Sequence, residues 1–295
     1  MVSQLTSRSI LVILSVALLS SCESAQFGDG RPTLPVLTSP ATTTALQEAG
    51  HALEDGRLAA AESRYSELLT VQPSNADAAI GLGETYLALG EWQKASDTFA
   101  GVTNVPHHAS ARQGQAIALM RLGRNEEAKN ILEGALEQNP KLWRAHNALA
   151  LLHEARGETA AAHEHFQKAS EINPKSAIVY NNLGYLMLNQ RAYSEAIVLF
   201  ERALSHDPKL VVARNNSRLA KAWQGRYAES IAGASNSEIS DILNDVGYIA
   251  MLRRDFDVAE AYFVRAMEAR PSYFERAARN LSQLRALISA AAQKP

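Results

Sequence analysis

The stretch Ala177–Pro208, which reads AIVYNNLGYLMLNQRAYSEAIVLFERALSHDP, decides the fold of this chain. Its small, apolar and proline positions return at matching places both upstream and downstream. The residues with such counterparts are Leu183, Gly184, Ala196, Phe200, Ala203 and Pro208. One short structural unit has therefore been copied along the chain, and its function depends on what an array of such units does.

Prolines set the length of the repeated unit. Steps of 33, 34, 34 and 34 residues separate Pro73, Pro106, Pro140, Pro174 and Pro208. Pro271 follows Pro208 after 63 residues, which is one period plus 29, so one unit in between has lost five residues. Because proline cannot continue a helix, each proline predicts the end of one helix pair and the start of the next.

The residue pattern within each unit resembles the tetratricopeptide repeat, whose period is 34 residues. The matching residues outside Ala177–Pro208 are Leu82, Gly83, Tyr86, Ala95, Phe99, Ala116, Leu119, Ala128, Leu132, Ala135, Leu149, Ala150, Ala162, Phe166, Ala169, Val246, Gly247, Ala250, Ala259, Phe263 and Ala266. The resemblance covers residues 42–291. It implies an all-α fold, a right-handed superhelical solenoid of about seven tetratricopeptide helix pairs plus a C-terminal capping helix.

Small residues and glycines explain how each helix pair would form. A small residue such as Gly184 lets the first helix of a pair, helix A, approach the second, helix B, where Ala196 meets it. Glycines that can adopt positive φ are predicted to close helix A in four units, at Gly90, Gly123, Gly157 and Gly225. Arg191 occupies this turn in the unit Ala177–Pro208, so the turn is less readily formed there.

The sixth unit and the C-terminal segment depart from the pattern. Residues 211–239 keep Trp223 and Gly225, but the second helix fades into the turn-forming run 233–237. This shortening is either a tolerated deletion at a surface or a hinge or partner-docking notch. Residues 273–291 predict one amphipathic helix that covers the last repeat. The residues on its apolar side are Ala277, Leu281, Leu284 and Ile288.

The overall charge and the cysteine content exclude several classes of function. The formal net charge is −2 and no run of lysines and arginines is present, so no nucleic acid partner is expected. The chain has one cysteine, Cys22, which rules out an internal disulfide framework and a cysteine-rich metal site.

The N-terminal segment is typical of a signal peptide. An apolar run, Ile10–Leu19, is too short to span a bilayer but fits a signal-peptide core. It ends in the sequence LSSC at Leu19–Cys22, which resembles the lipobox of bacterial lipoproteins. The resemblance implies cleavage after residue 21 and lipidation (palmitate and related acyl chains) of Cys22. A conventional signal peptide that leaves Cys22 as a free thiol is the alternative.

The segment after Cys22 predicts a tether between a lipid anchor and the repeats. Residues 22–43 are rich in Ser, Thr, Gly and Pro and show no helical period. In the lipoprotein family an Asp after the lipidated cysteine favours the inner membrane, so Glu23 implies the outer membrane. The predicted organisation is a signal peptide at 1–21, a flexible tether at 22–43 and the repeat array with its capping helix at 44–291.

No constellation of catalytic or metal-binding residues stands out. His163 and His165 are two residues apart and point in different directions on a helix, while His146 and His153 fall at helix A positions that pack between helices. The sequence contains no phosphate loop, nucleophile elbow or His-Glu-x-x-His motif. We therefore predict no enzyme, no catalytic or metal site, no cofactor and no small-molecule substrate.

One set of polar residues predicts a partner-binding groove. Four asparagines share the same helix A position in successive units, and in the tetratricopeptide family that face lines a concave groove. Side-chain amides there can donate to and accept from the backbone of an extended peptide, and apolar residues follow one turn later. The predicted groove residues are Asn147, Asn181, Asn215, Asn244, Tyr185, Leu219 and Tyr248. The alternative is that these asparagines are common in the family and simply solvated.

The whole plan resembles the TadD-type lipoproteins of the tight adherence (Flp) pilus system. The features that carry this resemblance are the lipobox, the short tether, the repeat array and the segment AEAYFVRAMEARPSYFERAARNLSQL at 259–284. It implies an outer-membrane scaffold, anchored on the periplasmic face, that binds proteins or extended peptide segments and assembles the secretin or pilus secretion apparatus. A periplasmic adaptor for cell-wall hydrolases or proteases is the alternative.

Overall fold

The computed structural model describes residues 40–103, 105–270 and 274–292. These residues form 15 helices and no strand, so the all-α prediction is confirmed. None of the described helices has the length and apolar character needed to cross a membrane. The predicted signal peptide, Cys22 and the tether as far as residue 39 lie outside the described residues.

The described helices pair in chain order, with one more helix after the last pair. The A helices are α1 (Pro40–Glu54), α3 (Ala76–Leu89), α5 (Val105–Arg121), α7 (Trp143–Ala155), α9 (Ala177–Asn189), α11 (Val211–Trp223) and α13 (Ile239–Leu252). The B helices are α2 (Leu58–Val71), α4 (Trp92–Ala100), α6 (Asn125–Gln138), α8 (Thr159–Ile172), α10 (Tyr193–His206), α12 (Tyr227–Ile231) and α14 (Phe256–Glu268). The closing helix is α15 (Glu275–Ala292). The predicted count of seven pairs and a capping helix is confirmed.

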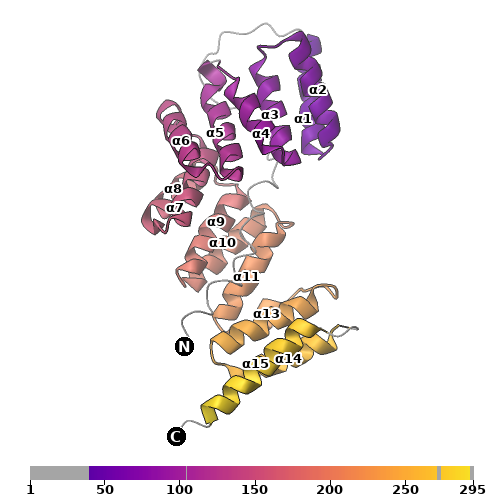
Figure 1. The fold of residues 1–295 in the computed structure, drawn as a ribbon, viewed down its shortest axis with the longest axis vertical. Helices are drawn as coiled ribbons and strands as arrows, with labels where there is room; N and C mark the ends of the chain where they lie inside the picture. The colour runs from indigo at the N-terminus through magenta and orange to yellow at the C-terminus, as the bar shows by residue number, and fades with distance from the viewer. Residues whose placement is uncertain (1–39, 104, 271–273, 293–295) are drawn as a thin grey trace. The chain divides into compact units, whose positions relative to one another are not determined.

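The array divides into two compact units, Met1–Val179 and Tyr180–Pro295, with the boundary in the first turn of α9. In the first unit, helices α1 to α8 pack in chain order, each against its neighbour within the unit (Figure 1). In the second unit, α10 to α15 pack in the same sequential way. Each unit is therefore a stack of helix pairs in which neighbours bury one another's apolar sides.

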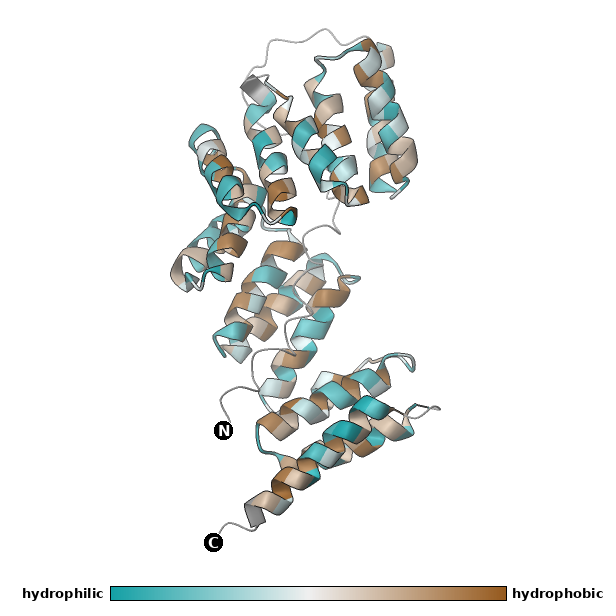
Figure 2. Ribbon diagram, in the orientation of Figure 1, coloured by the Kyte–Doolittle hydropathy of each residue, from teal (hydrophilic) through white to brown (hydrophobic). Residues whose placement is uncertain are grey.

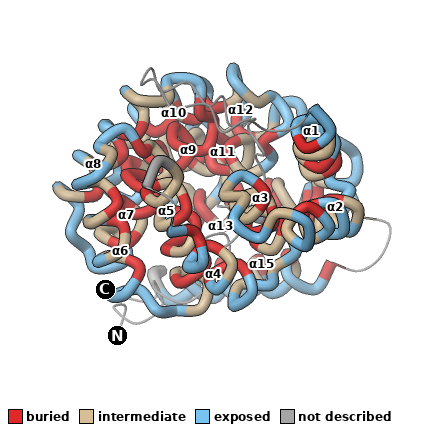
Figure 3. The backbone as a smooth tube through the Cα atoms, turned by 90° about the horizontal axis from the view of Figure 1, so that it is seen from above, coloured by how far each residue is buried: buried red, intermediate tan, exposed pale blue. Residues whose placement is uncertain are grey.

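Amphipathic helices supply the core of both units. Brown and teal segments alternate around the helices in Figure 2, and buried and exposed residues alternate along the tube in Figure 3. In four of the pairs, the B helix contributes a phenylalanine to the core. Each of these four side chains is at most 1% exposed. These residues are Phe99, Phe166, Phe200 and Phe263.

Glycine permits the close approach of helix A to helix B. A Cβ atom added to Gly184 of α9 would lie 2.8 Å from Cε1 of Phe200 in α10. The same clash would arise between Gly83 and Phe99, at 2.7 Å, and between Gly247 and Phe263, at 2.9 Å. Because real Cβ atoms do not approach this closely, a larger residue would push the pair apart. The predicted need for a small residue is confirmed, but the side chains nearest to Gly184 are Phe200 and Leu199 and not the predicted Ala196.

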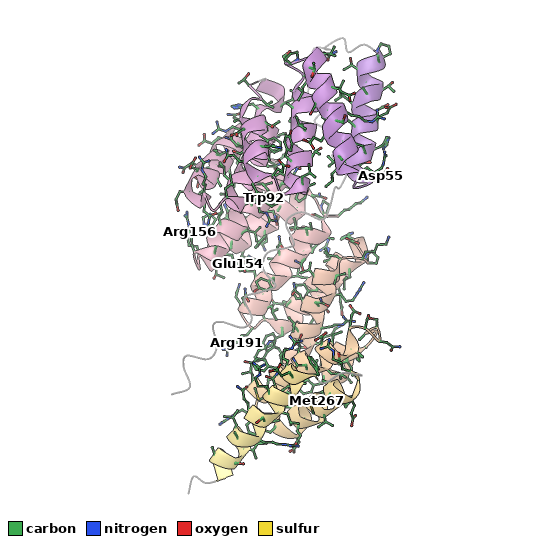
Figure 4. The ribbon with its side chains drawn as sticks, turned by 45° about the vertical axis from the view of Figure 1, so that its right-hand side comes forward. Asp55, Trp92, Glu154, Arg156, Arg191 and Met267 are labelled. Carbon is green, nitrogen blue, oxygen red and sulfur yellow. The ribbon has the colours of Figure 1, made fainter. Side chains whose placement is uncertain are left out.

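The turns between helix A and helix B adopt the left-handed conformation predicted for them. The φ angles are +78° at Gly90, +77° at Gly123, +75° at Gly157 and +83° at Gly225. Arg191 adopts φ 63° in the same place after α9, and Figure 4 shows its label at that turn. Arg254, which the sequence comparison did not single out, adopts φ 70° after α13. Both arginines carry the backbone strain that glycine avoids.

The sixth pair has a short second helix, as predicted. Helix α12 contains 5 residues, whereas α10 contains 14 and α14 contains 13. Ala232 leaves the helical region with ψ 137°, and Gly233 then adopts φ 68°. The chain reaches α13 through residues 232–238, which form turns and irregular structure.

Two predicted boundaries differ from the structure. Helix α1 begins at Pro40, although residues up to 43 were assigned to the tether. Proline suits the first helical turn because its missing N–H would have no partner there, and Thr42 is 5% exposed and accepts a hydrogen bond from Nε2 of Gln72 at 2.8 Å. In α15, Ala277, Leu281 and Leu284 are buried as predicted, but Ile288 is 36% exposed. The last turns of α15 extend beyond the helix that it covers.

Candidate partner-binding surface

The predicted groove residue Asn181 lies in α9 and is 2% exposed. Its Oδ1 accepts a hydrogen bond from Nδ2 of Asn216 in α11 at 3.1 Å. Its own Nδ2 donates to Oδ1 of Asn182 at 3.2 Å. A buried amide needs such partners, because an unpaired polar group away from water is costly. Asn181 therefore joins two successive A helices.

Asn244 repeats this arrangement further along the second unit. It lies in α13, is 2% exposed, and its Oδ1 accepts from Nδ2 of Asn280 in α15 at 2.9 Å. Its Nδ2 donates to Oδ1 of Asp245, the next residue, at 3.2 Å. In both cases the asparagine accepts from the second helix further along the chain and donates to the residue that follows it. The same hydrogen-bonding arrangement therefore links α9 to α11 and α13 to α15.

The other two predicted asparagines differ from each other. Asn147 lies in α7 of the first unit and is 4% exposed. Asn215 lies in α11, is half-buried, and its Oδ1 accepts from Nη1 of Arg218 at 3.3 Å. Three of the four amides expected to line an accessible groove are thus buried. The structure corrects that expectation of accessibility, whereas partner binding itself remains a prediction.

The residues missed from the sequence are Asn216 and Asn280. The 34-residue period selects Asn215, but it is the next residue, Asn216, that donates to Asn181, and Asn216 is 2% exposed. The tandem asparagines 181–182 and 215–216 were the available signal. Oδ1 of Asn216 is buried without a hydrogen-bond partner among the described residues.

The apolar groove residues Tyr185, Leu219 and Tyr248 are all half-buried. Leu219 packs against the core cluster that contains Leu243 and Val246, and Tyr248 packs against a neighbouring cluster in the same unit. Each side chain therefore retains some surface for contact while its remaining area stabilises the unit. Together with Asn215, these residues are the accessible part of the predicted groove.

A pair of charged residues joins two A helices of the first unit. Nη1 and Nη2 of Arg144 in α7 donate to the two carboxylate oxygens of Glu84 in α3, at 2.5 Å and 3.1 Å. This two-point geometry is the strong form of an arginine–carboxylate contact. The residues are 60 positions apart, so a period of 34 gave no indication of the pair.

The second unit has one shallow depression beside its short helix. It has a volume of about 450 Å³, and α14 contributes one stripe of its surface to the lining. The guanidinium of Arg265 lies 5.2 Å from the centre of the Tyr262 ring at its edge. The lining residues are Gly225, Arg226, Tyr227, Ala228, Glu229, Val258, Ala261, Tyr262 and Arg265. The depression lies beside the shortened helix of the sixth pair, and a docking role for it remains a prediction.

The described residues offer no constellation for metal-dependent chemistry. No group of three or more His, Cys, Asp or Glu side chains in residues 40–103, 105–270 and 274–292 is placed to hold a metal ion.

Comparison with protein-family models assigns the chain to a family. Two family models, each described as Tetratricopeptide repeat, match residues 52–105 and 153–214 in one case and 114–177 in the other. Together they cover more than half of the chain. The chain is a tetratricopeptide repeat protein. Such repeats are generally non-catalytic and mediate protein–protein interaction, so the chain has the architecture of an interaction scaffold. No curated protein matches it.

Solved tetratricopeptide structures share the fold. The thermophilic protein TTC0263 of Thermus thermophilus has 21% identity and a TM-score of 0.53, over 64% of this chain and 98% of its own. Human IFIT1, in a dimer with m7Gppp-AAAA, has 16% identity and a TM-score of 0.57, over 85% and 65%. A chain of the APC/C hetero-tetramer Cut9-Hcn1 has 15% identity and a TM-score of 0.56, over 82% and 42%. At these identities the similarity shows the fold alone.

Proposed function

We propose that this tetratricopeptide protein is a lipoprotein of the outer membrane that holds protein partners on the periplasmic side. The observation that carries the proposal is the sequence LSSC at Leu19–Cys22, directly after an apolar run of signal-peptide length. Cleavage before Cys22 and acylation of its thiol anchor the chain. Glu23 in place of Asp favours the outer membrane.

The anchoring chemistry fits a stable attachment. An acyl chain contributes about 0.8 kcal/mol per buried methylene, so one chain binds weakly and several chains bind durably. Residues 23–39, with three prolines at 32, 35 and 40 in or next to the segment, separate the anchor from α1. The repeat array therefore faces the periplasm while the chain stays bound to the membrane.

The partners that we propose are components of the tight adherence (Flp) pilus secretion apparatus, its secretin among them. The support is the resemblance to TadD-type lipoproteins in the lipobox, the tether and the repeat array. The half-buried residues Asn215, Tyr185, Leu219 and Tyr248 supply one amide and three apolar surfaces for an extended segment of such a partner.

Two experiments test this function. Metabolic labelling with a fatty acid should mark the wild-type chain and not a Cys22→Ala variant, and labelling that persists in the variant would contradict acylation at this residue. Deletion of the coding sequence should abolish secretin multimers and surface pili. Normal pili with altered levels of cell-wall hydrolases would instead support a periplasmic adaptor.

The partner is identified by co-purification. The detergent-solubilised lipoprotein should retain a secretin or pilus component, and a Cys22→Ala chain should lose it in cells while binding it in solution. Retention of unrelated hydrolases alone would contradict the pilus role.

A further inference from the structure

Three histidines of the fourth helix pair lie together. His146 and His153 belong to α7, and His165 belongs to α8. The Nδ1 atoms of His146 and His165 are 3.0 Å apart, and the ring of His153 stacks on that of His165 with centres 5.4 Å apart. The packing of α8 against α7 creates this cluster, which no sequence spacing indicated.

The hydrogen bonds define where the protons are. Nε2 of His146 lies 3.1 Å from the carbonyl oxygen of Pro140, which can only accept, so this nitrogen carries a hydrogen. In a neutral His146 the Nδ1 atom is then an acceptor, and Nδ1 of His165 donates to it. The pair holds one proton between its two Nδ1 atoms, as long as His146 stays neutral.

Burial and neighbouring groups keep the pair neutral. His146 is 7% exposed, and its burial lowers its pKa although the bond to Pro140 opposes this. Burial, followed by the charges of His146, His153 and Lys168, lowers the pKa of His165 to about 4. The pKa of each histidine therefore lies below the ordinary histidine pKa of about 6.5.

The charged groups around the pair come from its own two helices. Lys168 and Glu164 of α8 act on both rings with opposite signs, and His153 of α7 is bonded to Glu158. From α6, which packs against α7, Lys129 pairs with Glu133 and acts on Glu158, and is not among the groups that act on His146 or His165. No charged side chain of the described part of α5 acts on the pair. No carboxylate is therefore bonded to either ring of the pair to hold an added proton.

We propose that the His146–His165 pair makes the fourth helix pair an acid-sensitive element, closed while both rings are neutral and opened by proton uptake. A proton on Nε2 of His165 would place a partly buried cation beside α7, and a further proton on Nδ1 of His146 would set two N–H donors against each other. In the opened pair both rings reach water and take up protons at their ordinary pKa. Opening is thus coupled to proton binding.

The direction of the pH effect follows from the lowered pKa values. A group whose pKa is lower in the folded state binds more protons when that state opens, so stability rises with pH in this range. The closed pair is fully stabilised above about pH 6.5 and loses stability as the pH falls towards about 4. One histidine with this shift makes opening about twentyfold more favourable at pH 5 than at pH 7.

Opening also affects neighbouring side chains of α7. Arg144, which binds Glu84 of α3, and Asn147 belong to the same helix. Displacement of α7 would therefore weaken the contact between Arg144 and Glu84.

Hydrogen exchange measured by mass spectrometry on the full chain in detergent with EDTA tests the proposal. Peptides from α7 and α8 should show an opening constant at least about tenfold larger at pH 5 than at pH 7, after correction for intrinsic exchange. Peptides from α3–α4 and α13–α14, which contain no histidine, should change less. An equal change in all three pairs would overturn the proposal.

Variants taken from sister repeats complete the test. Leu199 and Tyr180 occupy the matching positions one period later, so His165→Leu and His146→Tyr introduce residues that a tetratricopeptide pair accepts. Either substitution should reduce the pH effect in α7–α8 to that of α3–α4. His163→Gln on α8, outside the cluster, should leave it intact. If His165→Leu does not fold at pH 7, the His146→Tyr variant provides the test. An undiminished pH effect on hydrogen exchange in α7–α8 of that variant would overturn the proposal.

Discussion

Asn216 of α11 donates from Nδ2 to Oδ1 of Asn181 in α9 at 3.1 Å, and both residues are 2% exposed. This contact makes Asn181 part of the stack of helices in the second unit. It also changes what a substitution there is expected to do.

Asn181→Ala should lower the stability of the second unit. It removes the acceptor of the buried Nδ2 donor of Asn216, at a cost of about 1–3 kcal/mol. Chemical denaturation followed by circular dichroism measures the change. Asn215→Ala, at a half-buried position, is the control and should stay within about 0.5 kcal/mol. A stable Asn181→Ala protein that loses its partner would instead assign the amide to binding.

Gly184→Ala should destabilise the fifth helix pair. The new Cβ would lie 2.8 Å from Phe200, a fully buried ring, so overpacking costs about 1–3 kcal/mol. The measurement is the thermal unfolding of this variant beside that of a control variant. Gly50→Ala in α1 is the matched control, because its nearest neighbour would lie at 3.8 Å. That variant should be neutral or more stable by up to about 1 kcal/mol, since alanine favours a helix. Equal losses in both would contradict the close-packing argument.

Arg191→Gly should stabilise the protein. Arg191 adopts φ 63°, a conformation that costs a residue with a Cβ about 1–2 kcal/mol and glycine much less. The expected gain is about 1 kcal/mol in the free energy of unfolding. Gly157→Ala reverses the exchange at φ +75°, where a Cβ meets nothing within 4 Å, and should lose a similar amount. A loss of stability in Arg191→Gly would show that the side chain makes a contact worth more than the strain.

Glu84 and Arg144 should show a measurable coupling. A double-mutant cycle with Glu84→Gln and Arg144→Gln is expected to give about 0.5–1 kcal/mol, because both side chains are about 30% exposed and water screens them. The coupling should fall as salt is added. A coupling near zero at low salt would mean that the bidentate geometry is not maintained in solution.

Packing residues of the repeat were the most predictable part of the structure. Gly184 and Phe200 recur in sister units because every helix pair solves the same problem of close approach, so repetition reveals them. Arg191 could be placed at a left-handed turn in the same way. The short α12 was visible as a run of turn-forming residues, and its 5 helical residues agree with that.

The candidate site was less predictable because its contacts join residues that do not share a repeat position. A period identifies Asn181 and Asn215 as equivalents, but it does not say that Asn216 turns inward or that Asn280 of α15 reaches Asn244. The exposure of an amide depends on how far one helix is rotated relative to the next. A difference of one residue, which is about 100° around a helix, decides whether the amide faces water or its neighbour.

The sequence by itself determined the repeat, its seven helix pairs and the positions of the turns, because these depend on local propensity and on packing that every unit repeats. Only the tertiary structure decided that Asn181 is a buried joint, that Arg144 binds Glu84, and that His146 meets His165. Those contacts depend on helix rotation and side-chain direction across residues 19 to 60 positions apart, which no spacing along the chain records.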